Sequence, residues 1–438
     1  MLMASQTTFN SSPNIINGND SKNISSINYS IEEIEHIIND FYSPTSQLTV
    51  PQRQQLNMYN FFGAVALCNK ISKHLSELDD NQIQQLFQQL IQRLVFYISI
   101  NSKQITIKLV VALGHLILNM MPDKWKNGIT AIITLFTQSQ NEFLIEHPEK
   151  GHLIVLNILT ILPEEFSRIV VSKAQRASIR TELESQFPTV LNYIQFIIST
   201  YNQPDILGKM FSCLSKWLEF GTSIVKVESL FDYLFNSLNN ENIFDDASNC
   251  IIVLFTSPDA LKYPSIFSRL LPYVLQLESI LDQSLMIGDK EKAECITKLI
   301  TQFGENLAQL IIQMAITPNQ QSQTLAHRFC CLVMKCTDMK GQYPIEETCS
   351  ELTFSFWYAL QEEVTSIDDD DKRIILLELF RPYFERLIEV LISKGQLPDN
   401  ESIFTSEDKE TFRCYRVDIT DTMMCMHNVL GNRAIEGK

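Results

Sequence analysis

The chain has 438 residues, which is more than one hydrophobic core normally holds, because single cores stop growing at roughly 250–300 residues. Apolar residues make up 45% and charged residues 20% of the chain, a balance that excludes disorder for most of its length. The 13 Gly and 15 Pro are too few for the turns of a many-stranded β protein. A formal net charge of -16 argues against direct nucleic acid binding and favours basic partners, although acidity that only keeps a large protein soluble explains the charge equally well.

Targeting signals and cysteine spacing indicate where the protein works. The N-terminus lacks a charged segment followed by an apolar run, and no stretch approaches 18 uninterrupted apolar residues. We therefore expect neither a signal peptide nor membrane insertion. The ten cysteines form no CxxC pair and no histidine stands at zinc-finger spacing, so we expect no metal site and no cofactor. Buried thiols in a reducing compartment account for the cysteines, and we expect the protein to be cytosolic or nuclear.

The beginning of the chain differs from the rest. Residues 1–28 are rich in Ser, Asn, Ile and Gly without sustained periodicity, so they are predicted to be a disordered leader. A helical pattern begins at Ile31, with Ser30 as its N-cap. It stops at Ser43 because the residue before a proline is disfavoured in a helix.

From Met58 to the end, amphipathic helices alternate with short polar breaks. In the segment Asn81–Ile98, for example, apolar residues recur at the three- and four-residue spacing of one helix face. The pattern predicts the following helices in chain order: Tyr59–Leu75, Asn81–Ile98, Gln104–Met121, Trp125–Gln138, Leu153–Leu162, Ile179–Thr200, Ile206–Phe220, Val227–Leu238, Phe244–Thr256, Ser265–Ile287, Lys290–Ile312, Thr324–Thr337, Cys349–Val364, Lys372–Ser393 and Ser406–Leu430.

Two successive helices form a unit of about 40–47 residues, which is the period of HEAT and armadillo repeats. One helix pair cannot bury its apolar faces alone, but a stack of pairs forms a continuous core. Residues 29–438 are therefore predicted to form an all-α HEAT-repeat α-solenoid, a superhelical arch of antiparallel helix pairs. The helix Ser406–Leu430 has no later helix to cover its apolar residues, so we expect an exposed apolar patch there.

Several segments go beyond this periodic pattern. In their order and spacing they resemble the importin-13/transportin-3 branch of the importin-β (karyopherin-β) family, N-terminal half only. The segments are Asn60–Leu67, Leu159–Phe166, Phe244–Ala247, Ser257–Tyr263, Leu285–Glu291, Phe303–Asn306, Tyr343–Thr348, Leu352–Gln361 and Phe412–Thr422.

The resemblance implies a nuclear transport receptor that binds Ran in its GTP form. Such a receptor carries basic or folded protein cargo through the nuclear pore and contacts Phe-Gly nucleoporins there. Two departures from the family pattern stand out. Only about fifteen residues separate Ser46 from Phe61, so the first inner helix, part of the surface that the family uses for Ran, is expected to be missing. The C-terminal arch of the family is expected to be absent as well.

Two polar groups are candidate contacts for Ran or cargo. Gln84, Gln85, Gln88 and Gln92 lie on the polar face of the second inner helix, where glutamine offers hydrogen bonds without charge; biased composition explains them equally well. The run Asp368, Asp369, Asp370 and Asp371 is placed in the short loop before the helix Lys372–Ser393. It is either an acidic contact for a basic partner or a solvated loop whose acids favour the following helix N-terminus.

No residue pattern indicates catalysis. There is no GxSxG, no HExxH and no glycine-rich phosphate loop, so we do not expect an enzyme. Trp125, Trp217 and Trp357 are interpreted as packing anchors between neighbouring helix pairs. His115 and His327, for which no companion acid or nucleophile is identified at helical spacing, are interpreted as structural. Cys330 and Cys331 should point about 100° apart on a helix, as adjacent residues do, which argues against a redox pair. The alternative to a transport receptor is a HEAT-type scaffold without Ran or pore binding.

Overall fold

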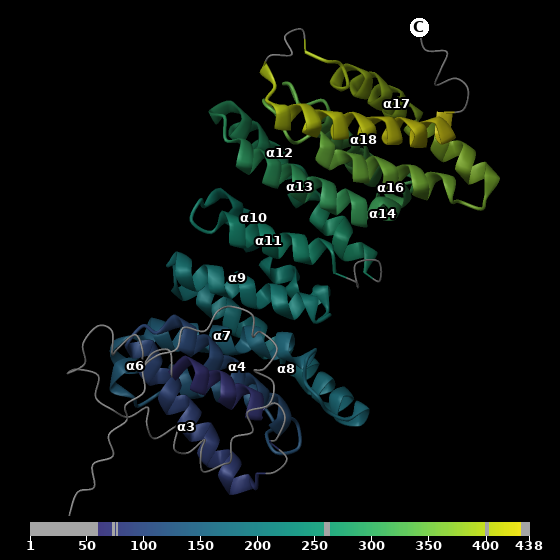
Figure 1. Cartoon of the computed structure of the whole chain (residues 1–438). Coiled ribbons are helices and arrows are strands. Elements are labelled where there is room, and N and C mark those ends of the chain that lie inside the picture. The colour runs from purple at the N-terminus through teal and green to yellow at the C-terminus, as the bar shows by residue number, and fades with distance from the viewer. Residues whose placement is uncertain (1–59, 72–74, 76–77, 258–262, 399–402, 431–438) are drawn as a thin grey trace, which may run out of the picture.

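The computed structural model describes residues 60–71, 75, 78–257, 263–398 and 403–430. Within these residues every regular element is a helix, which confirms the predicted all-α class. Figure 1 shows the helices stacked in chain order, from α3 at one end to α17 and α18 at the other. The predicted leader, the pattern that begins at Ile31 and most of the stretch from Ser46 to Phe61 lie outside the described residues.

The helices alternate between two layers. A helix at 60–71 precedes the stack. The first layer consists of α4 (Lys103–Met120), α7 (Pro148–Phe166), α9 (Pro204–Glu219), α11 (Phe244–Phe255), α13 (Lys290–Asn306), α16 (Phe354–Thr365) and α18 (Ser406–Leu430), each packed on the next. The second layer consists of α3 (Asp80–Ser99), α5 (Gly128–Thr137), α8 (Lys173–Thr200), η3 (Ile224–Leu230) with α10 (Phe231–Asn236), α12 (Pro264–Ile287), α15 (Gln320–Thr337) and α17 (Asp370–Lys394).

Four short elements complete the described chain: α6 (Glu142–Glu146), η4 (Ser237–Asn239), α14 (Ala308–Ile316) and η6 (Glu351–Thr353). Two predicted helices are divided in the structure. The segment Val227–Leu238 is 3-10 helix over much of its length, and Lys290–Ile312 breaks at Leu307 into α13 and α14. Pro163 does not end α7, which continues to Phe166.

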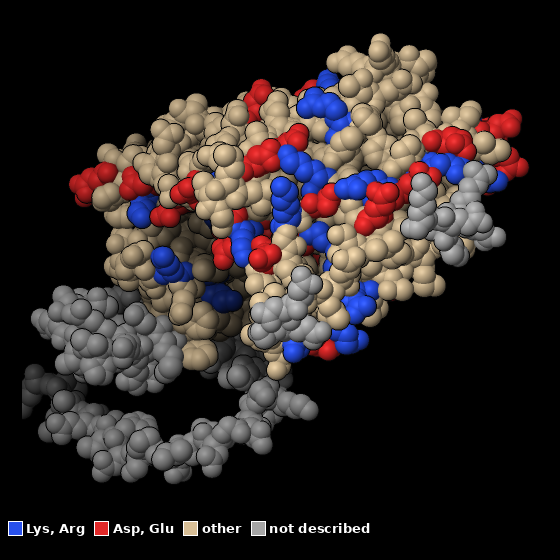
Figure 2. Space-filling model, turned by 90° about the horizontal axis from the view of Figure 1, so that it is seen from above, with Lys and Arg blue, Asp and Glu red and all other residues tan. Residues whose placement is uncertain are grey.

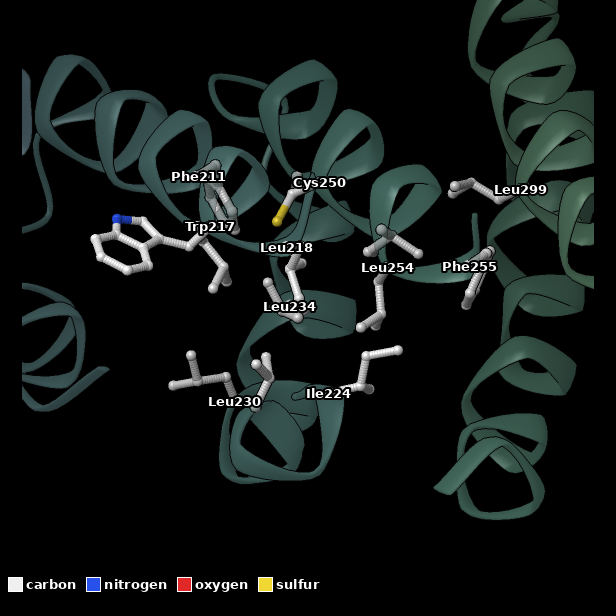
Figure 3. Packing of buried hydrophobic residues seen from close by; sticks show 14 of the residues in the cluster. Phe211, Trp217, Leu218, Ile224, Leu230, Leu234, Cys250, Leu254, Phe255 and Leu299 are labelled. Carbon is white, nitrogen blue, oxygen red and sulfur yellow. The ribbon is translucent and has the colours of Figure 1, made fainter. Parts of the chain in front are cut away.

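Buried aromatic rings join successive repeats. Phe255 of α11, Phe303 of α13, Phe329 of α15 and Phe356 of α16 form a chain of edge-to-face contacts with centroid separations of 5.1, 5.5 and 5.6 Å, and all four are fully buried. Gly304 is required beside this chain, because a Cβ there would lie 2.5 Å from Phe356 and 2.9 Å from Phe329. Figure 3 shows the same continuous packing earlier in the stack, where α9 and α11 meet.

The tryptophans are packing anchors, as predicted. Trp217 of α9 is fully buried, donates from Nε1 to the carbonyl of Leu159 in α7 at 2.9 Å and stacks on Phe187. Trp357 of α16 is also fully buried and donates to Oγ1 of Thr337 at 2.9 Å. Trp125 is half-buried and packs edge-to-face on Phe87.

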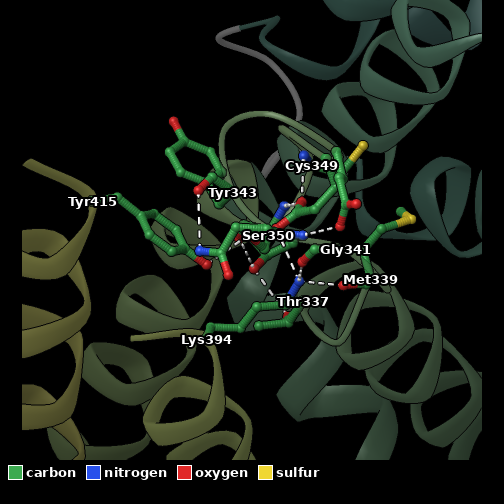
Figure 4. A network of polar contacts seen from close by, with 12 residues as sticks. Thr337, Met339, Gly341, Tyr343, Cys349, Ser350, Lys394 and Tyr415 are labelled. Atoms are coloured by element: carbon green, nitrogen blue, oxygen red, sulfur yellow. Dashed lines mark hydrogen bonds and ion pairs between the residues drawn. The ribbon is translucent and has the colours of Figure 1, made fainter. Parts of the chain in front are cut away.

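A buried polar network holds the loop between α15 and α16 (Figure 4). Nζ of Lys394 lies 2.9 Å from Oε1 of Glu347 and also donates to the carbonyls of Met339 and Gly341. The other Glu347 oxygen accepts the backbone N–H groups of Cys349 and Ser350 at 2.9 and 3.0 Å. Side chains of Lys394 and Glu347 are only 10% and 3% exposed, so this ion pair belongs to the core.

The apolar side of α18 is covered more fully than the sequence suggests. The helix packs on α16 and α17, which bury Ile419, Met426 and Leu430, while Val417 and Met424 are exposed. The expected large uncovered patch is therefore wrong for most of its residues.

The most apolar long helix, α4, has the length and composition of a membrane span, with a mean hydropathy of 1.2 over 18 residues. More than half of it is buried within the protein, where it packs on α3 and α7 as a core helix does.

Candidate interaction surface

The four candidate glutamines lie on the exposed side of α3. Asp79 fixes the start of this helix through a capping box with Gln82, and the apolar side of the helix faces the core. Gln84, Gln85, Gln88 and Gln92 are all exposed, as predicted. None of their side chains has a hydrogen-bond partner among the described residues.

The four candidate aspartates straddle the start of α17. The prediction placed all of them in a loop, but only Asp368 and Asp369 precede the helix, whereas Asp370 and Asp371 form its first turn. Asp369 is the N-cap, and its Oδ1 accepts the backbone N–H of Lys372 at 3.2 Å; this hydrogen bond lowers the pKa of Asp369. Asp370 pairs with Arg373. Asp368 and Asp371 have no side-chain partner within the described chain.

The structure does not bring these two groups together. Both α3 and α17 belong to the second layer, but they lie at opposite ends of the stack (Figure 1). A partner that touched both groups would have to extend along the whole second layer. The two groups therefore lie on separate parts of an elongated surface, with exposed amides at one end and carboxylates at the other.

Between these ends, the second-layer helices are joined by side-chain pairs that we call the ladder. The ladder consists of Glu228–Arg269 between η3 and α12 (2.8 Å), Glu278 and Asp282 with Lys335 between α12 and α15 (2.9 and 2.7 Å) and Asp338–Arg386 between the end of α15 and α17 (2.8 Å). In each pair the acid comes from the earlier repeat and the base from the next. Hydrogen bonds with Asp282 and Glu278 outweigh the opposing effect of partial burial, so the pKa of Lys335 is raised.

Sequence reasoning missed the ladder. Its partners are separated by about one repeat, 57 residues for Glu278 and Lys335 and 48 for Asp338 and Arg386. Acid–base pairs recurring at the repeat period are the signal that could have identified them. Seen from above, acidic and basic side chains lie beside one another over much of the surface in view (Figure 2).

Two histidines have partners that were not anticipated. Nε2 of His115 in α4 lies 3.0 Å from Oε2 of Glu165 in α7; both residues are buried, and burial lowers the pKa of His115. His327 contacts the hydroxyl of Tyr383, and its Nε2 lies 3.7 Å from Sγ of Cys331, one turn later on the same helix. The statement that His327 lacks a nucleophile at helical spacing is therefore wrong.

The cysteines of the described chain are unpaired thiols that lie outside any metal site. Cys330 is buried and Cys331 is exposed, so they point apart, and all ten cysteines are free thiols. Among the described residues no cluster of three or more His, Cys, Asp or Glu side chains is arranged to hold a metal ion. What the second layer offers is hydrogen bonds and charge along its length.

Known proteins of similar sequence share this architecture. Family models match residues 102–251 (Exportin 1-like protein), 288–393 (Transportin-3/Importin-13 second TPR domain) and 396–433 (Importin 13 repeat). Importin-13 of Mus musculus is 32% identical over 374 residues, covering 85% of this chain and 38% of the relative. The mRNA transport regulator MTR10 of Saccharomyces cerevisiae is 23% identical over 397 residues, covering 85% and 37%.

A solved structure, importin-13 in its cytosolic state, superimposes with a TM-score of 0.70 at 23% identity, covering 86% of this chain and 42% of that one. Fold and matches together define a HEAT-repeat solenoid of the importin-β class. Within that class, the chain belongs to the importin-13/transportin-3 branch. It spans about 38% of the length of the importin-13 relatives that it matches.

Proposed function

We propose that this chain works as a nuclear transport receptor. In this role it binds Ran in the GTP form, carries basic or folded protein cargo through the nuclear pore, contacts Phe-Gly nucleoporins and shuttles between cytoplasm and nucleus. The observation that carries the proposal is the similarity to importin-13, at 31–32% identity over 85% of this chain. That similarity runs along the stacked repeats as a whole and is not confined to one motif.

The surface of the second layer suits such partners. Free glutamine amides on α3 offer donors and acceptors to a folded protein without attracting or repelling its charges. Asp368 and Asp371 present uncompensated carboxylates at the other end. Together with the net charge of -16, they favour the approach of a basic protein face. Binding of Ran and of cargo would be reciprocal, so each would change the affinity of the other by the same factor.

Capture of Ran tests the proposal. The immobilised chain is incubated with Ran loaded either with a non-hydrolysable GTP analogue or with GDP, and the bound Ran is measured. We expect capture of the GTP form only. Changing Gln84 and Gln88 to Ala should reduce it, whereas Gln104→Ala on α4, which is also exposed but lies in the first layer, should leave it unchanged. Equal or absent capture of both forms by folded protein would favour a scaffold without a Ran or pore role.

The aspartates provide a kinetic test of the same surface. Replacing Asp368, Asp369, Asp370 and Asp371 with Asn keeps an N-cap on α17, because Asn caps helices as well as Asp does. The variant should associate with Ran or with a basic cargo more slowly, with a smaller change in dissociation, since charges outside a buried contact mainly steer the encounter. The difference from the unmodified chain should shrink as salt rises, because the Debye length is about 8 Å at physiological ionic strength. If the variant dissociated at a different rate from the unmodified chain but associated at the same rate, this role would be contradicted.

A further inference from the structure

The thiol of Cys331 is exposed on α15, in the second layer. Among the ten free cysteines only Cys331 and Cys414 are exposed, whereas Cys330 and Cys336 of the same helix are buried. Adjacent helical side chains point about 100° apart, so Cys330 cannot form a disulfide with Cys331 without a change in the backbone. A covalent partner for Cys331 therefore has to come from outside this helix.

His327 presents a ring nitrogen to this thiol. It precedes Cys331 by one helical turn, and its Nε2 lies 3.7 Å from Sγ. On the other side of the ring, Nδ1 contacts the hydroxyl of Tyr383 in α17. The same hydroxyl shares a hydrogen bond with Cys331. When it donates to the sulfur, its oxygen accepts Nδ1–H, and the lone pair of Nε2 then faces the thiol. A thiol, an imidazole and a group that orients the imidazole are the parts of an activated nucleophile.

The surroundings keep this thiol protonated until a base removes the proton. Partial burial raises the pKa of Cys331, the hydrogen bond with Tyr383 lowers it, and the carboxylate of Glu278 in α12 raises it, so that the pKa lies above its usual value. The ammonium group of Lys335, one turn later, is bound to acidic side chains of α12. The intrinsic nucleophilicity of a thiolate rises with its pKa, so Cys331 becomes a strong nucleophile once His327 has taken its proton.

We propose that Cys331 is a modification site at which a small-molecule disulfide forms a mixed disulfide with the protein, with His327 as the base. Nε2 of His327 takes the proton from the thiol, and Sγ attacks one sulfur of the disulfide. The S–S bond of the reagent breaks as the new S–S bond forms. The departing thiolate takes the proton from His327 and leaves as a thiol. Tyr383 is a positioning residue, since it holds the imidazole toward the sulfur.

The adduct lies beside the ladder. Residues four apart share one side of a helix, so Cys331 and Lys335 face the same way. Glu278 of α12 and Tyr383 of α17 both lie near enough to the thiol to change its pKa. Modification therefore adds a group to the second layer where α15 packs on α12 and α17. This site is separate from the candidate glutamines and aspartates, and it does not depend on the binding of Ran.

Reaction rates at individual cysteines test the proposal on the full chain. The reagent is bis(2-hydroxyethyl) disulfide, which carries no charge, and the fraction of each cysteine in a mixed disulfide is followed by acid quenching and peptide mass spectrometry. Cys414 is the control within the same molecule. It is also exposed, but its sulfur lies 3.9 Å from Glu410 and 3.8 Å from Arg413, and no imidazole among the described residues contacts it. We expect Cys331 to react about tenfold faster than Cys414, less than the roughly 10²–10⁴-fold that a positioned base typically contributes, because both groups are exposed to water. An equal or slower reaction at Cys331 would overturn the proposal.

Variants then assign the faster reaction to the imidazole. His327→Gln should slow Cys331 to about the rate of Cys414 and leave Cys414 unchanged. Tyr383→Phe keeps the aromatic ring but removes the hydroxyl, so it should slow Cys331 by a smaller factor; an unchanged rate would remove its positioning role. His147→Gln, at another exposed histidine, is the matched control and should change neither rate. Circular dichroism and thermal unfolding verify that each variant folds. If His327→Gln leaves the rate at Cys331 unchanged, or if His147→Gln slows it equally, His327 is not the base and the proposal fails.

Discussion

Between α11 and α16 the repeats are joined through buried aromatic rings, whereas between η3 and α17 the second-layer helices are joined at the surface by ion pairs. Phe303, Phe329 and Phe356 are fully buried, and the shapes of their rings determine how closely the repeats approach. The side chains of Lys335 and Glu278 are 39% and 41% exposed, and those of Arg386 and Asp338 are 52% and 48% exposed. The solenoid is therefore joined in two ways, by packed rings in its interior and by screened charge on the surface of its second layer, and α15 takes part in both through Phe329 and Lys335.

This difference has a consequence for how the solenoid can deform. Packed rings lose contact steeply when they separate, since dispersion falls off within fractions of an ångström. Exposed ion pairs contribute only about 0–1 kcal/mol each and weaken with salt. A charged partner that competes for a ladder residue therefore breaks only exposed pairs of low energy, while the aromatic core keeps the repeats together.

Removal of a ring should have the largest effect if the core carries the stability. Phe329→Ala deletes a fully buried side chain that touches both Phe303 and Phe356, and large-to-small changes of this kind cost about 3–5 kcal/mol. We expect a large fall in the thermal unfolding temperature. Phe96→Ala, at 43% exposure, is the control and should change it little. Similar losses from both variants would show that burial does not distinguish the core from the surface here.

Substitution of Lys394 tests an ion pair that belongs to the packed core. Lys394→Met leaves Glu347 buried without its cation, and breaking a buried pair in this way costs about 3–5 kcal/mol. Glu347 keeps its bonds from Ser350 and Cys349, so we expect the lower end of that range. Chemical denaturation measures the change. The double variant Lys394→Met with Glu347→Gln should recover part of the loss, and failure to recover would show that the lysine acts through its contacts with Met339 and Gly341.

The sequence predicts the packed core better than the ladder. Apolar periodicity alone places Ile83 and Leu90 of α3 in the core and Ser406–Leu430 on one helix, because burial follows helical spacing within one segment. Lys335 and Glu278 cannot be paired in this way, since they meet only after two repeats have stacked. The break at Leu307 was missed for the same reason, because α14 turns to pack on α15 and α16. The candidate contacts on α3 could be predicted as exposed, but their separation from α17 required the stack.

The pH dependence of stability at His152 tests whether the packed core tolerates a charge. Its Nδ1 lies 2.8 Å from the hydroxyl of Tyr193, and rings of Phe196 and Tyr201 surround it. Burial lowers the pKa of His152 from the usual value of about 6.5. Below that pH the unfolded chain binds a proton that the folded chain excludes, so stability should fall as the pH falls, by at most about 1.4 kcal/mol per pH unit. His152→Gln should remove this contribution to the slope. An identical slope in the variant and the unmodified chain would contradict the exclusion of the proton.

The ladder should give the smallest change in stability and the clearest change in local motion. Lys335→Gln removes the cation that joins α12 to α15, and because its side chain and those of its partners are substantially exposed, we expect a loss below about 1 kcal/mol. Amide hydrogen exchange should nevertheless quicken in the facing turns of these two helices, since local opening can occur without global unfolding. Lys216→Gln is the matched control, because Lys216 pairs with Glu219 inside one helix at similar exposure and joins no two repeats. High salt should reproduce the Lys335→Gln exchange pattern in the unmodified chain. If exchange in α12 and α15 is the same in all cases, the second layer is held by its buried contacts and not by its charges. The contrast between the packed rings and the ladder would then not extend to the dynamics of the solenoid.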